Sequence, residues 1–221
     1  MITDKRAFKD YIFGEIASIA KALSNANRVE IIDLLTNGEK TVEQISREVN
    51  ITVANASQHL QSLKSLKIVR TRRQKNFIYY SITHKSFIQV WQGLRDFVLM
   101  NNAEVQHTID EFRKGIGDFK TISLAEYMDE IIKKEHILID VRPEDEFEHG
   151  HIHGAISMPV DQLKDHLSLL KDHENIVIYC RGPLCVFADQ AASQISALGY
   201  NAFRMEEGYQ DWELIQTNIS E

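Results

Sequence analysis

The spacing of the apolar residues changes near residue 115, and this change predicts two parts with different folds. Before it, apolar residues recur at three- and four-residue steps, as in residues 8–23 and 87–112, which is the period of amphipathic helices. After it, continuous apolar runs at residues 137–141 and 176–179 alternate with helical segments. Such runs are typical of buried parallel strands. We therefore expect a mostly helical part followed by an α/β part.

Two glycines, Gly115 and Gly117, end the helical pattern and indicate a linker. With 221 residues, the chain has room for two domains of ordinary size, which we expect at residues 1–116 and 117–221. The apolar runs are much shorter than a membrane span needs, and the first residues lack an apolar signal core. We therefore expect a cytoplasmic protein without a membrane partner.

The charge is divided unevenly along the chain, so the net charge of -7 hides a basic part. Residues 1–120 hold 18 Lys and Arg against 13 Asp and Glu, a balance of +5, whereas residues 121–221 hold 7 against 19, a balance of -12. No acidic residue occurs between Glu48 and Asp96, where eight basic residues lie. This block favours a surface for a polyanion, and the alternative is a solvated positive face.

The first part continues with two short helices and a hairpin. Thr41 and Gln44 have the spacing of a capping box, which predicts a helix over residues 42–49. Thr52 is a suitable N-cap for a second helix over residues 53–66. Alternating residues then predict strands at 68–72 and 77–82, with residues 73–76 at the hairpin tip. This order predicts an α+β, mostly α, winged helix-turn-helix domain.

This part resembles the ArsR/SmtB-type repressors over residues 10–114. The resemblance rests on the segment Ala22–Arg28, on the segment Thr52–Leu60 and on the hairpin. It implies binding to double-stranded DNA, with the helix over residues 53–66 in the major groove. Five polar residues would then face base edges, and three basic residues would contact phosphates; the alternative for each is a solvated surface. The expected base-facing residues are Thr52, Asn55, Ser57, Gln58 and Gln61, and the expected phosphate contacts are Arg72, Arg73 and Lys75.

The ArsR resemblance also implies a homodimer, and a two-fold dimer would select a pseudo-palindromic operator. The family often senses metals, but residues 41–49 contain no cysteine, so a thiolate site is excluded there. A weaker alternative is a carboxylate and histidine site around His107, with Glu104, Asp110 and Glu111 at helical spacing. We expect no metal and no cofactor.

The second part alternates strands and helices, which predicts an α/β domain with a parallel sheet. Helices are expected over residues 123–132, 160–170 and 186–198, and a third strand over residues 202–205. Cys180 follows the strand at residues 176–179, where ligands bind in such sheets. Loop amides and the next helix N-terminus would stabilise its thiolate, and the alternative is an inert buried cysteine.

The second part resembles a single rhodanese domain from about residue 122 to residue 214. The segments that carry the resemblance are Leu138–Arg142, Glu146–Phe147, Gly150–Ala155, Met158–Pro159, Tyr179–Gly182 and Glu207–Trp212. In such a domain, the alternating His149, His151 and His153 are structural and do not form a zinc site.

The rhodanese resemblance implies transfer of a sulfane sulfur through a Cys180 persulfide, without a metal. The amides of residues 181–186 would form an anion cradle. The expected catalytic residues are Cys180, Arg181, Gly182, Leu184, Cys185 and Val186.

Three residues depart from the rhodanese pattern and put full activity in doubt: Pro183, which has no N–H, Cys185, and His153, which stands where proline is usual. Cys185 could resolve a modified Cys180 into a disulfide or polysulfide, or it could simply pack in the loop.

Together, the two parts favour a transcription regulator, acting as a repressor, that senses or carries sulfane sulfur or oxidants through Cys180. Its partner would be a small sulfur donor or an oxidant. The alternative is an active sulfurtransferase, using thiosulfate or a similar donor, with an accessory DNA-binding domain. A third hypothesis is a rhodanese fold that only binds other proteins, for which Cys180 would be dispensable.

Overall fold

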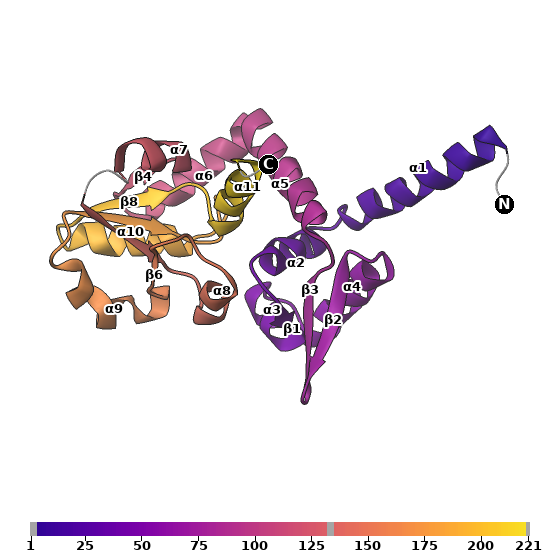
Figure 1. Cartoon of the computed structure of the whole chain (residues 1–221), viewed down its shortest axis with the longest axis horizontal. Helices are drawn as coiled ribbons and strands as arrows, with labels where there is room; N and C mark the ends of the chain where they lie inside the picture. Colours follow the sequence, from indigo (N-terminus) through magenta and orange to yellow (C-terminus); the bar gives the residue numbers. More distant parts are fainter. Residues whose placement is uncertain (1–3, 132–134, 220–221) are drawn as a thin grey trace. The chain divides into compact units, whose positions relative to one another are not determined.

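The computed structural model describes residues 4–131 and 135–219. The chain forms two compact units, Met1–Trp91 and Gln92–Glu221, and the boundary falls inside helix α5 (Lys85–Asn101) (Figure 1). Among the described residues, no helix has the length and the apolar character needed to cross a membrane.

The first unit consists of helices followed by a hairpin. Its helices are α1 (Lys5–Ala22), α2 (Ala26–Thr36), α3 (Val42–Glu48) and α4 (Val53–Ser65), and its strands are β1 (Lys40–Thr41), β2 (Val69–Gln74) and β3 (Phe77–Ile82). The strands form an antiparallel sheet in the order β1-β3-β2. The capping box of Thr41 and Gln44 is present, and Thr52 caps α4. The predicted winged helix-turn-helix is therefore confirmed.

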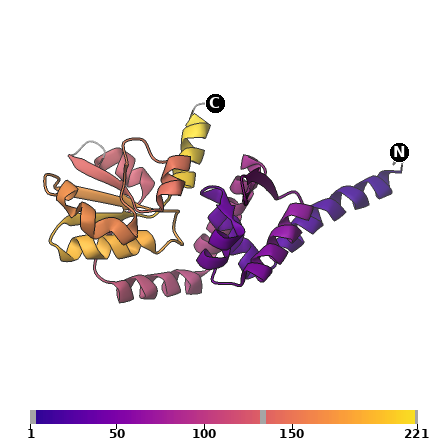
Figure 2. The same ribbon diagram turned by 90° about the horizontal axis from the view of Figure 1, so that it is seen from below.

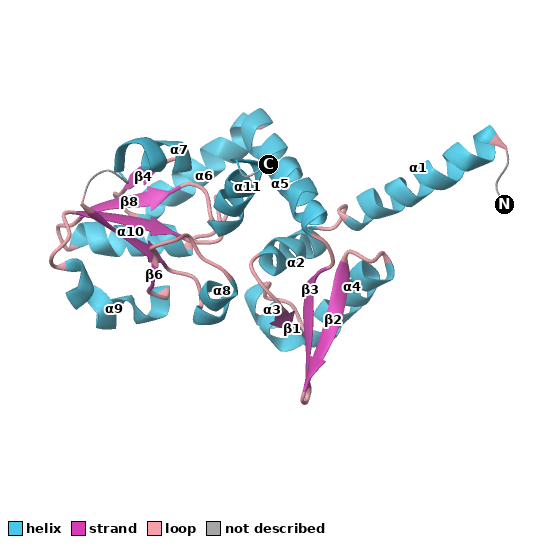
Figure 3. Ribbon diagram, in the orientation of Figure 1, coloured by secondary structure: helices cyan, strands magenta, loops and turns pink. Residues whose placement is uncertain are grey.

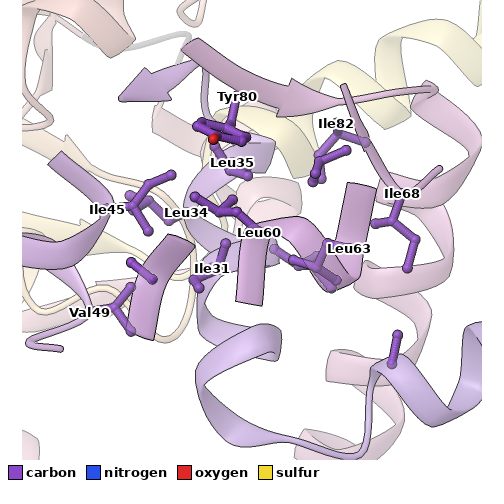
Figure 4. Close-up of a cluster of buried hydrophobic side chains, with 14 of the residues drawn as sticks. Ile31, Leu34, Leu35, Ile45, Val49, Leu60, Leu63, Ile68, Tyr80 and Ile82 are labelled. Carbon is purple, nitrogen blue, oxygen red and sulfur yellow. The ribbon is translucent and has the colours of Figure 1, made fainter. Parts of the chain in front are cut away.

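One apolar cluster forms the core of the first unit (Figure 4). Ile31 of α2, Ile45 of α3 and Leu60 of α4 are completely buried in it. Ala56 and Leu63 lie on the same side of α4 as Leu60, because residues three and four positions apart share a helix face. Burying a side chain of this size stabilises the fold by about 1.5–3 kcal/mol. This packing leaves the opposite face of α4 exposed.

The second unit contains a five-stranded parallel sheet. Its strands are β4 (Lys120–Ile122), β5 (His136–Asp140), β6 (Ile156–Ser157), β7 (Asn175–Tyr179) and β8 (Asn201–Met205). They pair in the order β4-β8-β7-β5-β6, and every pair is parallel (Figure 3). All five residues of β7 are buried because β7 is the central strand and both of its faces are covered. The predicted α/β domain is confirmed.

Helices cover both faces of this sheet. They are α6 (Ala103–Ile116), α7 (Leu124–Glu126) with a π-helical turn at Tyr127–Ile131, α8 (Glu144–His149), α9 (Leu163–His166) between two 3-10 turns at Val160–Gln162 and Leu167–Leu170, α10 (Phe187–Ala197) and α11 (Tyr209–Ile219). Side chains of β7 alternate between two cores. Ile176 and Ile178 pack with alanines of α10, whereas Val177 and Tyr179 pack with residues of α7 and α11.

Several sequence-based boundaries need correction. The periodic stretch at residues 87–112 is broken, because Asn102 accepts backbone hydrogen bonds that start α6. The expected helix at residues 160–170 is a short α-helix between two 3-10 turns. The expected helix at residues 123–132 continues as a π-helical turn, and its last residue lies outside the described residues. The turn at the tip of the hairpin contains fewer residues than predicted, because β2 extends to Gln74.

The domain boundary expected after residue 116 stays a prediction. In the structure, the second half of α5 and all of α6 pack with the α/β unit, which therefore begins at Gln92. The contacts responsible are made by Gln92 and Arg95 with Asp211 and by Arg113 with Asp189.

Candidate functional site

Helix α4 presents a polar, solvent-facing surface. Thr52, Gln58 and Gln61 are exposed, and Asn55 and Ser57 are half-buried. The Thr52 hydroxyl accepts a hydrogen bond from the Asn55 amide at 3.2 Å, so Thr52 also starts the helix. The five residues expected to face bases therefore lie on α4 or at its N-cap, and none of them belongs to the buried face of the helix. Their amide and hydroxyl groups are suited to hydrogen bonds with base edges.

The three basic residues expected to contact phosphates are all exposed on the hairpin, but their environments differ. Arg72 forms an ion pair with Glu39 and lies over the ring of Tyr79, 5.1 Å from its centroid. Its hydrogen bond with Glu39 is the main reason that the Arg72 pKa is raised. Arg73 and Lys75 lie at the end of the hairpin. The Glu39 carboxylate partly neutralises the charge of Arg72. Arg73 and Lys75 are therefore better suited than Arg72 to bind a phosphate.

Cys180 lies immediately after β7, and only 1% of it is exposed to solvent. Its thiol donates to the Cys185 carbonyl oxygen, at an S···O distance of 3.4 Å. The loop between them turns sharply, since the Cys185 amide donates to the Gly182 carbonyl at 3.1 Å and Gly182 has a φ of 142°. The Cys185 amide is thus used inside the loop. The anion cradle expected from residues 181–186 stays a prediction.

The Cys180 thiol is buried and acidic at the same time. Burial alone raises its pKa, but a hydrogen bond from Cys185, the positive charge of Arg204 and the amides of Gly182 and Ala188 lower it to about 7. The Cys185 pKa is raised, first by that hydrogen bond and then by burial. Cys180 is therefore the more acidic thiol of the pair and the one that more readily forms the thiolate, which is the reactive form.

Arg204 connects the reactive loop to a buried carboxylate. It is fully buried in β8, donates to Asp189 of α10 at 2.9 Å, and reaches the Gly182 carbonyl at 3.3 Å. Arg113 of α6 pairs with the same carboxylate at 3.3 Å and donates to the Pro183 carbonyl at 3.2 Å. Two guanidinium groups thus share Asp189 behind the loop that carries Cys180.

The Arg181 side chain points to a different partner. It donates to both carboxylate oxygens of Glu146, at 2.6–3.1 Å, and lies over the ring of Phe187. Glu146 is completely buried in α8. A bidentate pair of this kind fixes the orientation of both side chains. The Arg181 guanidinium is therefore used to anchor the loop to α8.

The segment that follows β8 packs directly on Cys180. A Cβ atom on Gly208 would lie 2.3 Å from the Arg181 carbonyl group and 2.6 Å from the Cys180 oxygen, so only glycine fits there. Asp211 accepts from the Gly208 amide at 2.9 Å, from Arg95 at 2.7 Å and from Gln92 at 3.0 Å. This segment therefore joins the loop to α5.

Apart from Arg181, sequence reasoning did not identify the charged residues around Cys180. Two of these residues carried a recognisable signal. Arg204 lies inside an otherwise apolar strand, and Asp189 lies in the first turn of the helix that follows the Cys180 loop. Charged side chains are rarely buried in such places unless they are paired. Arg95 and Arg113 carried none, because exposed helical arginines have the same local pattern. Among the described residues, no group of three or more histidine, cysteine or acidic side chains could hold a metal ion.

Two family descriptions match this chain. Residues 25–71 match "Bacterial regulatory protein, arsR family" and residues 123–214 match "Rhodanese-like domain". The first range contains α4, and the second contains the Cys180 loop.

One curated relative matches almost the whole chain, and others match a smaller share of it. The chain is 32% identical over 213 residues to the HTH-type transcriptional regulator Rv0324 of Mycobacterium tuberculosis, covering 96% of this chain and 93% of the relative. It is 37% identical over 65 residues to the transcriptional repressor SdpR of Bacillus subtilis, covering 29% of this chain and 72% of that one. Among solved structures, the homodimeric winged helix-turn-helix domain of Mb0332 from Mycobacterium bovis is 29% identical, with a TM-score of 0.43, covering 47% of this chain and 94% of that one.

Proposed function

Because this chain belongs to the ArsR family of bacterial transcription regulators and carries a C-terminal rhodanese-like domain, we propose that it is a cytoplasmic, homodimeric repressor whose DNA binding is controlled by Cys180. Sulfane sulfur donors or oxidants would modify this residue. The observation that carries the proposal is the buried Cys180 thiol, whose pKa is lowered to about 7 by its surroundings. A thiolate of this kind reacts at neutral pH without a metal.

The surface of α4 and the hairpin support the DNA-binding part of the proposal. The exposed amides of Gln58 and Gln61 can read base edges, and Arg73 and Lys75 can bind phosphates. A two-fold dimer presents two such helices, so the preferred operator is pseudo-palindromic.

An apolar face on α1 supports the homodimer. Large side chains at helical spacing are exposed along this helix: Phe8, Tyr11, Ile12, Phe13 and Ile16. Monomeric soluble proteins rarely expose a contiguous apolar patch of this kind. The relative from Mycobacterium bovis is described as homodimeric, and we assign this face of α1 to contact with a second copy of the chain.

The chemistry at Cys180 is sulfur transfer from a persulfide donor. The Cys180 thiolate attacks the outer sulfur of the donor, a new S–S bond forms at Cys180, and the donor leaves as a thiolate. Cys185 can then act as the resolving thiol. When it loses its proton and attacks the inner sulfur of the Cys180 persulfide, a disulfide forms and hydrosulfide leaves.

The experiment compares DNA binding before and after Cys180 is modified. An operator is first selected from random-sequence duplexes by repeated binding to the reduced protein. Its affinity is then measured with and without inorganic polysulfide, for the wild type, Cys180→Ser and Cys185→Ser. We expect polysulfide to weaken binding by the wild type and to leave Cys180→Ser unchanged. Equal responses of the wild type and Cys180→Ser would refute the proposal.

A second assay separates sensing from catalysis. The wild type is incubated with thiosulfate and a thiol acceptor, and product formation is followed over many turnovers. A sensor forms about one modified Cys180 per chain and then stops. Continuous turnover that Cys180→Ser abolishes would instead support the sulfurtransferase alternative.

A further inference from the structure

Three buried charged residues form one cluster behind the Cys180 loop. The Asp189 carboxylate accepts from Arg204 at 2.9 Å and pairs with Arg113 at 3.3 Å. The exposed fractions of these side chains are 4% for Asp189, 0% for Arg204 and 16% for Arg113. The charges of these three side chains sum to one net positive charge, and the carboxylates of Glu206 and Asp110 act on it only from the Arg113 side. A Cys180 thiolate supplies the matching negative charge.

Both guanidinium groups also hold the backbone of the loop. Arg204 donates to the carbonyls of Gly182 and Pro183 at 3.3 and 3.4 Å, and Arg113 donates to the Pro183 carbonyl at 3.2 Å. The Pro183 oxygen thus accepts from two different elements, β8 and α6. A loop fixed at this point keeps Cys180 in place relative to Arg204.

We propose that Arg113 is a positioning residue that completes the Cys180 site: it offsets the charge of Asp189, so that Arg204 stabilises the Cys180 thiolate, and it fixes the Pro183 carbonyl. Without Arg113, Arg204 and Asp189 would form a neutral pair. A neutral pair stabilises a nearby anion much less than a cation does, and the difference is large in a buried, weakly screened environment.

Arg113 comes from outside the rhodanese-like region. It lies near the end of α6 (Ala103–Ile116), whereas the match to that family begins at residue 123. Helix α6 lies along α10, which carries Asp189 (Figure 2). The reactive site is therefore complete only when α6 is docked. By thermodynamic reciprocity, a change in the charge of Cys180 also changes the free energy of α6 docking.

This inference rests on the proposed function, because it identifies α6 as the element whose docking would respond to modification of Cys180. Other charged groups lie near the cluster. Asp110 and Glu206 interact with Arg113, and Arg181 is bound to Glu146. Burial, followed by repulsion from Arg204, lowers the Arg113 pKa. Cys185 is the titratable group that touches the Cys180 sulfur directly, and every variant below retains it.

The test measures the rate of Cys180 alkylation by iodoacetamide against pH in the full-length protein. Trypsin cleaves after Arg181, so mass spectrometry reads Cys180 and Cys185 in separate peptides. The variants are Arg113→Gln, which keeps a hydrogen-bond donor but removes the charge, and Arg113→Lys, which keeps the charge. The matched control is Lys114→Gln, the same loss of charge one residue later on an exposed part of α6.

We expect Arg113→Gln to raise the midpoint of the pH profile by about one pH unit, a size typical of the loss of a nearby charge. Arg113→Lys should retain most of the wild-type midpoint, and Lys114→Gln should retain all of it. An unchanged midpoint in a folded Arg113→Gln protein would overturn the inference, and so would an Arg113→Lys profile equal to that of Arg113→Gln. If Arg113→Gln does not fold, Arg113→Met is measured in its place. DNA binding is not measured in this test, so a failure of the proposed function is seen separately in the polysulfide assay.

Discussion

Arg95 donates a hydrogen bond to Asp211 at 2.7 Å, and the two side chains are only 7% and 11% exposed. The pair lies against the reactive loop, because a Cβ atom on Gly182 would be 3.4 Å from both partners. It connects α5 to the segment that packs on Cys180. Burial is the largest effect and opposes the charged form of Arg95, but the charges and hydrogen bonds of Asp211 and Asp96 together outweigh it, and the Arg95 pKa is raised.

Loss of this buried pair should destabilise the second unit. We expect Arg95→Met to lower the free energy of unfolding by about 3–5 kcal/mol, because Asp211 is left as a buried charge without its cation. Urea denaturation in a Trp91→Phe background checks this, since Trp212 is then the single tryptophan and reports on the second unit. Arg6→Met, which breaks an exposed pair with Asp10, is the control and should change little.

A side chain at residue 208 should disturb the reactive loop. We expect Gly208→Ala to lower the free energy of unfolding by about 1–3 kcal/mol, because its Cβ overlaps the backbone of Cys180 and Arg181. Alkylation of Cys180 should change as well, because its backbone must shift. The control is Gly93→Ala in α5, where no atom lies within 4 Å and alanine favours the helix. Equal stabilities of the two variants would contradict the overlap.

The reactivity of Cys180 should follow its lowered pKa. Alkylation needs the thiolate, so its rate should rise with pH, reach half of its maximum near pH 7 and fall about tenfold for each pH unit below that. Cys185→Ser should move the midpoint upward, because it removes the thiol whose hydrogen bond lowers the Cys180 pKa. Alkylation of Cys185 should remain slow at neutral pH, since its pKa is raised. A midpoint at the ordinary thiol value of about 8.5 would contradict the described surroundings.

Salt dependence should distinguish the basic residues of the hairpin. We expect Arg73→Gln to weaken binding to all duplexes and to reduce the slope of log affinity against log salt by about 1, as for the loss of one phosphate contact. Arg72→Gln is the matched comparison, and its effect should be smaller because Glu39 already pairs with Arg72. Equal slopes for Arg73→Gln and the wild type would remove Arg73 from the interface.

The base-facing prediction has a different signature. We expect Gln58→Ala to cost about 1–3 kcal/mol of discrimination between the selected operator and single-base variants, while its salt slope stays unchanged. Competition binding with a set of such variants measures this. A uniform loss of affinity across all sequences would indicate that Gln58 contacts the DNA backbone and not a base.

The sequence by itself determined the order and type of most elements. The capping box at Thr41, the N-cap at Thr52 and the helical spacing of Ala56, Leu60 and Leu63 are signals contained within a few residues, and the structure retains all of them. The central strand before Cys180 was equally clear, because a strand buried on both faces must be apolar throughout. Short edge strands such as β4 and β6 were missed because two or three residues carry no periodicity.

Only the tertiary structure decided what surrounds Cys180. Arg113, Asp189 and Arg204 come from α6, α10 and β8, and they meet because parallel strands and their crossover helices bring distant segments together at one sheet edge. Asp211 and Arg95 meet in the same way. The local spacing of residues cannot predict these contacts between distant segments, since each arginine alone has the sequence pattern of a solvated residue. The cysteine was visible in the sequence, but the charges that lower its pKa could be located only in the fold.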